Sequence, residues 1–273
     1  MTTSKRNTTL LYVLLILLMA IASVANVAAE DVGCAIEPNR KVQLSTAVEG
    51  VLDEVKVKRG DVVKAGEIVA LLQSGVEKAA VKLAQKRAGL KAQIDARKAR
   101  VKSAERKLRR AQDLVDKNFV SSEELEDAAT ELEVAERNLQ EALESQQLSK
   151  LDLVRAKEQL ALRVIKSPIQ GVVVQTFLSG GEFAQGQPIL EIAAIDPLHV
   201  EVILPMSEYG LITLGSKAVV SPEAPLEGEY DAVVTIVDKV VDAASGTFGV
   251  RLLLPNADLR LPAGVECQIS FSP

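Results

Sequence analysis

The chain has 273 residues, of which 48% are apolar and 25% charged, and its net charge is −5. This length is sufficient for two small hydrophobic cores and an elongated helical segment. The small negative charge gives no reason to expect nucleic-acid binding, which needs a basic face or stripe, and the sequence contains no phosphate-binding glycine loop that would indicate a nucleotide-dependent enzyme.

The first 29 residues have the parts of an export signal. Lys5 and Arg6 precede an apolar core at residues 10–22, and small side chains lead to Ala29. We therefore expect a signal peptide at residues 1–29 that is cleaved after Ala29. An uncleaved anchor is the alternative, because residues 10–29 are about long enough to span a bilayer.

The two cysteines, Cys34 and Cys267, lie near opposite ends of the exported part. Export would place them where disulfides form, but the residues leave both a bridge and two buried free thiols open. A bridge requires the two ends to meet. We hypothesise that residues 30–41 form a strand segment that packs beside the last strand of the chain. Two titratable thiols in denatured, unreduced protein would exclude the bridge.

Residues 42–74 alternate with the period of short β-strands and are punctuated by Gly50, Gly60 and Gly66. We expect short strands joined by tight turns. About four such strands are too few to bury an apolar face alone, so this stretch needs a partner elsewhere in the chain.

Residues 75–161 contain two heptad runs separated by a short break at residues 117–121, which predicts two continuous helical arms packed antiparallel as a coiled-coil hairpin. In the first run the expected seam consists of Val76, Ala80, Leu83, Arg87, Leu90, Ile94, Arg97, Val101, Ala104, Leu108, Ala111 and Val115. In the second run it consists of Leu125, Leu132, Leu139, Gln146, Leu153 and Leu160, with Ala128, Ala135, Ala142, Ser149 and Ala156 three residues after the first five.

The two arms carry opposite charge. Residues 78–117 contain fourteen Lys or Arg and four Asp or Glu, whereas residues 121–161 contain four and eleven. We expect the arms to be electrostatically matched. Exposed ion pairs add little stability, but they help to set which helices pair.

Residues 162–195 repeat the pattern of residues 42–74. The pentapeptide that begins at Val48 aligns with the one that begins at Ile169, and the later glycines follow with a slip of one residue. We expect the two halves to pack together as one small β-sandwich, with the helical hairpin inserted between them in the sequence.

Residues 196–273 contain five further strand candidates, at residues 199–204, 217–221, 230–241, 249–254 and 265–271, and a short helix at residues 207–214. Their number and spacing favour a small antiparallel β-barrel, which leaves no exposed sheet edge. The single histidine, His199, opens a strand without a second metal ligand nearby, so we expect a structural histidine and neither a metal site nor a catalytic one.

This succession of parts resembles the periplasmic adaptor subunits of Gram-negative tripartite efflux pumps, also called membrane fusion proteins or HlyD-like proteins. The landmarks that carry the resemblance are the segments 48–51 (VEGV), 60–66 (GDVVKAG), 167–173 (SPIQGVV) and 261–264 (LPAG). The β-sandwich resembles a lipoyl domain whose modified lysine would lie where the hairpin is inserted. Lys78, the nearest lysine, has no carrier motif around it, and no cofactor is implied.

The resemblance implies a mixed α and β fold, namely a split lipoyl-like β-sandwich with an inserted long antiparallel α-helical coiled-coil hairpin, followed by a small antiparallel β-barrel. The expected parts are residues 1–29 (signal peptide), 30–41 (N-terminal strand segment near the barrel), 42–74 and 162–195 (the two halves of the lipoyl-like domain), 75–161 (hairpin) and 196–273 (barrel).

The function implied by the resemblance is that of a non-enzymatic adaptor, located in the periplasm in association with the inner membrane. It would link an inner-membrane efflux transporter to a TolC-type outer-membrane channel, as an oligomer that encloses a sealed conduit for export. Many adaptors for resistance-nodulation-division pumps have a further domain after the barrel, whereas this sequence stops at Pro273. A resistance-nodulation-division transporter is the first expectation, and an ABC or other exporter the second.

A structural coiled-coil spacer of the cell envelope, without a transport partner, is the alternative function. The split lipoyl-like repeat favours the adaptor, because a spacer has no need of it. A transporter gene beside this one would support the adaptor.

The resemblance also points to residues at the tip of the hairpin. Arg110, Leu114 and Ser121 stand in an Arg-x3-Leu-x6-Ser arrangement that looks like the motif with which family adaptors engage TolC-type channels. Each residue has a purely structural alternative. Arg110 would be a solvated charge, Leu114 would pack in the seam beside Val115, and Ser121 would be an N-cap with Glu124 three residues later.

Overall fold

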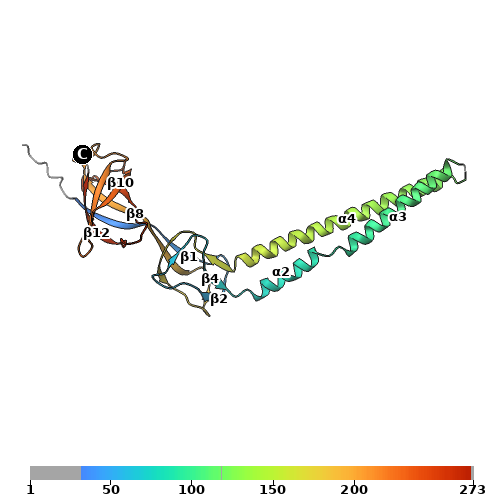
Figure 1. The fold of residues 1–273 in the computed structure, drawn as a ribbon, viewed down its shortest axis with the longest axis horizontal. Coiled ribbons are helices and arrows are strands. Elements are labelled where there is room, and N and C mark those ends of the chain that lie inside the picture. Colours follow the sequence, from blue (N-terminus) through green and yellow to red (C-terminus); the bar gives the residue numbers. More distant parts are fainter. Residues whose placement is uncertain (1–31, 118, 272–273) are drawn as a thin grey trace, which may run out of the picture. The chain divides into compact units, whose positions relative to one another are not determined.

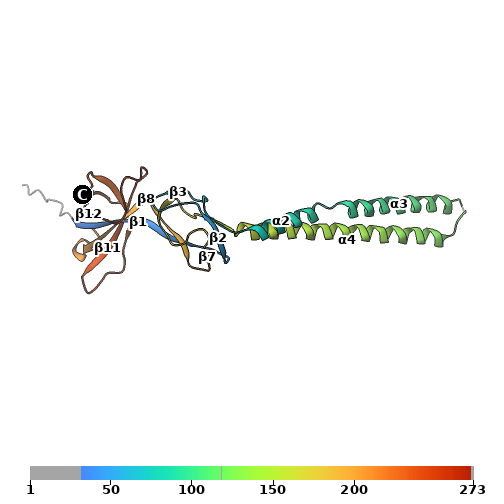
Figure 2. The ribbon, with the colours of Figure 1, turned by 90° about the horizontal axis from the view of Figure 1, so that it is seen from below.

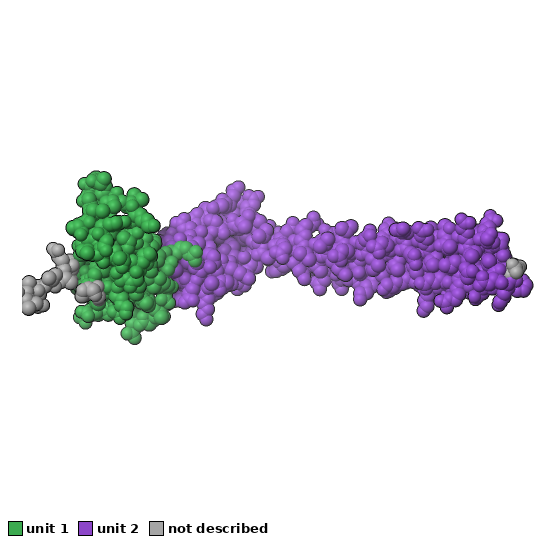
Figure 3. All heavy atoms as spheres, turned by 90° about the horizontal axis from the view of Figure 1, so that it is seen from above, with its two compact units in different colours: residues 1–40, 195–273 green, residues 41–194 purple. Residues whose placement is uncertain are grey.

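The computed structural model describes residues 32–117 and 119–271. The chain divides into two compact units, Met1–Arg40 with Ile195–Pro273 (unit 1) and Lys41–Ala194 (unit 2), which Figure 3 shows in different colours. Unit 1 is thus assembled from two segments with unit 2 inserted between them in the sequence. The expected signal peptide at residues 1–29 lies outside the described residues. In the part that is described, no helix combines the length and apolar character needed to cross a membrane.

Unit 1 is a β-barrel in which neighbouring strands follow the order β1-β12-β9-β10-β11-β8, and a further pairing of β1 with β8 closes it. Every second side chain of a strand points into the barrel and forms its core. In β11 these buried side chains are Phe248, Val250, Leu252 and Leu254. The strands are β1 (Val32–Ser45), β8 (Pro188–Pro205), β9 (Lys217–Pro222), β10 (Tyr230–Val237), β11 (Thr247–Leu254) and β12 (Val265–Phe271).

Three details of the barrel differ from the sequence-based expectation. The segment expected to begin at residue 196 is part of one uninterrupted strand, β8. Strand β10 ends at Val237 instead of continuing to residue 241. The helix expected at residues 207–214 is a single 3-10 turn, η1 (Met206–Glu208), because Gly210 has φ of 93°, which a right-handed helix excludes.

Unit 2 contains the lipoyl-like β-domain, built around a separate apolar core that includes Leu52, Val63, Val69, Ile189 and Ile192. The strands, besides the last part of β1 and the first part of β8, are β2 (Gly50–Val55), β3 (Val62–Val63), β4 (Ile68–Leu72), β5 (Val164–Lys166), β6 (Gly171–Thr176) and β7 (Phe183–Ala184).

The two halves of this domain pair reciprocally. Strand β2 pairs with β4 and β7, and the equivalent strand β6 pairs with β8 and β3. The Gly60 N–H donates to the Val173 carbonyl at 2.8 Å, and the Gly181 N–H donates to the Leu52 carbonyl at 2.8 Å. Gly181, and not Gly180, is therefore the counterpart of Gly60, and both need glycine because their φ values are 90° and 93°. Each half completes the hydrogen bonds of the other.

One strand-opening glycine allows β6 to lie close against β8 within the second half of the domain. A Cβ atom on Gly171 would lie 2.2 Å from the backbone oxygen of Ala193, whereas on the equivalent Gly50 its nearest neighbour would be a side-chain atom, Nη1 of Arg163, at 2.6 Å, which can move without a shift of the backbone. We expect Gly171→Ala to lower the free energy of unfolding of unit 2 by about 3 kcal/mol or more, because the backbone of β8 must shift. Gly50→Ala is the matched control, with a smaller loss. Hydrogen exchange of unit 2 peptides measures both, and equal losses would contradict the expectation.

The hairpin contains three helices, α2 (Gly75–Ala88), α3 (Ala92–Val115) and α4 (Ser122–Ala161). Both α2 and α3 run alongside α4, as Figures 1 and 2 show from two directions. The second arm is one helix of 40 residues. The expectation of a continuous first arm is wrong, because that arm is broken at residues 89–91.

The expected seam holds in α4 and α3 but not in α2. All eleven seam positions of α4 are buried or half-buried, and the seven expected in α3, from Ile94 to Val115, are its only residues that are not exposed. In α2 the side chains that turn inward are instead Glu77, Val81, Ala84 and Ala88, each one residue later than expected. The break therefore changes the phase of the helix by one residue.

Direct ion pairs between the two arms of opposite charge are few. Among the described residues, only Lys107 and Glu131 form a salt bridge between α3 and α4, at 2.7 Å. The hydrogen bond between them lowers the pKa of Glu131 and raises the pKa of Lys107. The two arms thus have opposite overall charge, as expected, but a series of direct salt bridges between them is not formed in the described part of the chain.

Candidate functional site

Ser121 forms the N-cap of α4 at the tip of the hairpin. Its backbone is extended, with φ −77° and ψ 160°, and its Oγ accepts a hydrogen bond from the Glu124 N–H at 3.4 Å. Glu123 and Glu124 lie in the first turn, where the positive end of the helix dipole stabilises their negative charge. The structural alternative for Ser121 is therefore realised, and the exposed hydroxyl still lies at the end of the hairpin.

Leu114 faces outward from the last turn of α3. Its side chain is 41% exposed, whereas Ala111 is buried and Val115 is half-buried in the seam. Seam packing is therefore not the main environment of Leu114. An apolar side chain held outward at a helix end is available for contact with another protein.

Arg110 lies one turn before Leu114 on the same side of α3, since residues four apart share a helix face. The guanidinium is exposed, and no ion pair among the described residues involves it. The structure thus brings an outward cation and an outward apolar side chain together on α3, with the Ser121 hydroxyl at the start of the partner helix. An apolar contact with directional hydrogen-bond donors beside it is suited to protein recognition.

Phe119 is a tip residue that the sequence analysis did not propose. Its side chain is 74% exposed, and its backbone N–H donates to the Leu114 carbonyl at 2.9 Å. Turns usually carry polar residues, so a phenylalanine in this one was a usable signal. Phe119 enlarges the apolar surface that Leu114 presents.

The base of the hairpin is anchored to the β-domain by Arg163. Its Nη2 lies 2.7 Å from the carboxylate of Glu77 on α2, and its Nη1 donates to the Glu49 carbonyl at 3.0 Å. Both side chains of the ion pair are half-buried. This contact stabilises the orientation of α2 seen here, with Glu77 turned toward the rest of unit 2.

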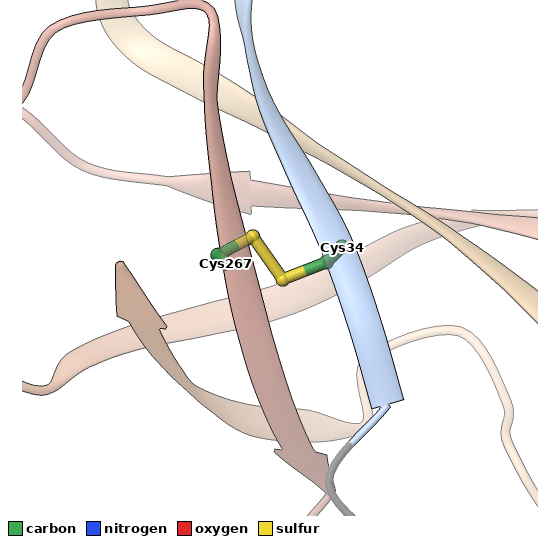
Figure 4. The surroundings of a disulfide bond; sticks show 2 residues. All are labelled: Cys34 and Cys267. Carbon is green, nitrogen blue, oxygen red and sulfur yellow. A yellow bond between two sulfur atoms is a disulfide. The ribbon is translucent and has the colours of Figure 1, made fainter. Parts of the chain in front are cut away.

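The cysteines are joined in a disulfide in the barrel (Figure 4). Strands β1 and β12 are antiparallel and place Cys34 directly opposite Cys267, with their Cα atoms 4.8 Å apart. Both residues are buried. The N-terminal segment thus lies beside the last strand, as the bridge requires.

Other chemistry-bearing residues do not assemble into a site in the described part of the chain. No group of three or more His, Cys, Asp or Glu residues there is close enough to hold a metal ion. His199 is half-buried in β8, and burial, followed by the charge of Arg251, lowers its pKa, so that the neutral ring is favoured.

Comparisons with known proteins cover most of the chain. Residues 40–193 match the family model described as "CzcB-like, barrel-sandwich hybrid domain". The chain is 30% identical to macrolide export protein MacA of Yersinia pestis, over 85% of this chain and 64% of that protein. It is 25% identical to nickel-cobalt-cadmium resistance protein NccB of Alcaligenes xylosoxydans xylosoxydans, over 85% of this chain and 55% of that protein. The chain spans about half to two thirds of the curated relatives it matches.

Solved structures share the fold. The crystal structure of MacA from Actinobacillus actinomycetemcomitans matches with a TM-score of 0.73 and 20% identity, over 89% of this chain and 78% of that one. The structure of the periplasmic adaptor protein EmrA matches with a TM-score of 0.50 and 19% identity, over 89% and 99% of the two chains.

Proposed function

The chain belongs to the CzcB-like barrel-sandwich hybrid family, and from this membership we propose that it is a periplasmic adaptor, or membrane fusion protein, of an efflux pump. The observation that carries the proposal is the β-domain in unit 2, whose two halves pair reciprocally although a helical hairpin separates them in the sequence. A spacer needs only the hairpin, so this split domain favours the adaptor. Its role is structural, with no catalytic step.

The hairpin tip is the contact with a TolC-type outer-membrane channel in this proposal. Arg110 and Leu114 supply an exposed cation and an apolar side chain, and Ser121 supplies a hydroxyl at the start of α4. Phe119 adds apolar area. The inner-membrane partner is an efflux transporter, of the resistance-nodulation-division class or an ABC exporter.

The adaptor works as an oligomer in this proposal, because a single hairpin cannot enclose a conduit. Large apolar side chains away from the seam remain exposed on α4, among them Leu148, Leu151 and Val154. The charges of α3 are mostly unpaired within the described chain, so they are available to the acidic arm of a neighbouring copy.

We propose that the exported compound is a metal ion or a macrolide, the two classes that the relatives' names suggest. NccB is named for nickel, cobalt and cadmium resistance, and MacA for macrolide export. A strain that lacks this chain and its transporter, tested against these ions and macrolides with and without the restored genes, identifies the class.

Site-specific photocrosslinking in cells tests the partners. A photoreactive residue at Phe119 should give an adduct with an outer-membrane channel, and one at Leu151 should give an adduct with a second copy of the chain. Val240, an exposed apolar position on the barrel, serves as the control for non-specific capture. Absence of a channel adduct from Phe119, with channel and transporter present, would contradict the proposed role of the tip.

A further inference from the structure

The break in the first arm leaves three large apolar residues outside the seam that the sequence assigns to them. Val76, Leu83 and Leu90 are seven residues apart and in phase with Ile94, the first buried residue of α3. Their side chains are 80%, 53% and 68% exposed. One unbroken helix from α2 to α3 would bring all three into the seam.

Two polar contacts hold α2 in the orientation seen here, in which Val76, Leu83 and Leu90 lie outside the seam. At its base, Glu77 pairs with Arg163. At the break, the Nε2 of Gln146 donates to the Leu90 carbonyl at 3.2 Å. Gln146 is the one position in the heptad series from Leu125 to Leu160 where glutamine replaces leucine, and the structure places it opposite the break.

Two of the three residues at the break have backbone angles close to those of a helix. Gly89 has φ −84° and ψ −9°, Lys91 has φ −113° and ψ −15°, and both fall in the right-handed helical region. The Gly89 N–H already donates to the Gln85 carbonyl with the i to i−4 spacing of an α-helix, at 3.2 Å. The residues on either side of Leu90 therefore need only modest changes of dihedral angle to join one helix.

We propose that α2 is a two-state element that switches between the broken register seen here and an unbroken register in which it is turned by about 100°, the angle of one helical residue. In the unbroken register Val76, Leu83 and Leu90 pack against α4, and Arg87 takes a seam position like the half-buried Arg97 of α3. The Glu77 to Arg163 pair and the Gln146 to Leu90 bond are broken. The apolar stripe favours one state and the two polar contacts favour the other.

The switch changes the surface of the base half of the hairpin and leaves the tip as it is. Helix α3 keeps the same seam in both states, so Arg110 and Leu114 keep their outward positions. The stripe of Val76, Leu83 and Leu90 is presented in the broken register and covered in the unbroken one. Contacts that a neighbouring molecule makes with this stripe are therefore available in one state only.

Thiol labelling of the full-length chain tests the switch. Single substitutions Leu83→Cys and Ala84→Cys are made in two backgrounds, the native one and the double variant Glu77→Gln with Gln146→Leu. Labelling with a maleimide under non-reducing conditions leaves the bridged Cys34 and Cys267 unreactive. In the native background position 83 should react faster than position 84, and in the double variant this order should invert.

Two controls separate a register switch from fraying. Leu108→Cys and Arg109→Cys in α3, one half-buried and one exposed, should keep their order of reactivity in both backgrounds. Insertion of one alanine after Gly89 increases the spacing from Ala88 to Ile94 from six to seven residues, a full heptad. With this insertion the present face of α2 is in phase with α3, so the double variant should no longer invert the order.

Three results would overturn the proposal. One is an unchanged order in the double variant. Another is equal, fast labelling at positions 83 and 84 while the α3 control is unchanged, which would indicate that α2 has frayed. The third is an inversion that persists in the chain with the inserted alanine.

Discussion

Replacing Leu114 with serine, or Arg110 with aspartate, is expected to reduce export to the level of a strain that lacks the chain. Leu114→Ser removes the apolar side chain that α3 presents at the tip, and Arg110→Asp reverses the charge of the exposed guanidinium beside it. Neither side chain is buried, so the free energy of unfolding should change by no more than about 0.5 to 1 kcal/mol. Export is scored as survival on the compound or ion against which the native chain protects.

Matched variants isolate the tip from the rest of the arm. Arg106→Asp makes the same charge change one turn nearer the base and on the same helix face as Arg110. Val134→Ser removes a similarly exposed apolar side chain from α4. Both should retain export. Full export by Leu114→Ser and Arg110→Asp would show that the tip is not part of the mechanism. Lower helical content or a lower thermal midpoint of unfolding in either variant would assign that residue a structural role.

Removal of the disulfide by the double variant Cys34→Ala and Cys267→Ala is expected to cause the largest loss of stability. The bridge joins residues 233 positions apart, and the loop-entropy relation gives a loss of about 5.5 kcal/mol for such a loop. If unit 2 stays folded while unit 1 unfolds, the effective loop is shorter, but the dependence on length is logarithmic and the loss remains about 4.5 kcal/mol.

The loss should be confined to unit 1. Hydrogen exchange measured peptide by peptide should show faster opening in β1 and β12, with exchange in the β-domain of unit 2 unchanged. The native chain kept under reducing conditions should behave as the double variant does. Two free thiols in the denatured, unreduced native protein, or unchanged protection of β12, would show that the bridge does not hold unit 1 together.

Much of the architecture follows from local patterns in the sequence. The period of two in Phe248, Val250, Leu252 and Leu254 fixes the inward face of β11, because successive strand residues point to opposite sides. The heptads of α4 fix its seam for a similar reason, since residues three and four apart share one helix face. Both patterns depend only on backbone geometry, so no knowledge of distant contacts is needed to interpret them.

The tip motif was visible in the sequence as a spacing, but its geometry was not. Whether Leu114 packs in the seam or faces outward depends on where α3 ends and how the turn reverses, and the structure shows the outward position. Phe119 has no periodic pattern to indicate it, and its only signal is an apolar residue in a turn, where polar residues are usual. The sequence leaves the disulfide open for a related reason, since only the pairing of β1 with β12 places Cys34 opposite Cys267.

Two β-halves around a helical hairpin, with a barrel after them, can be predicted from the sequence alone, because amphipathic periodicity and glycine spacing are local properties of the chain. The phase of α2, in contrast, depends on tertiary contacts. Its sequence offers two apolar faces one residue apart, and the choice between them rests on contacts with residues far along the chain, Arg163 at the base and Gln146 at the break. Helical periodicity alone carries no information about such contacts.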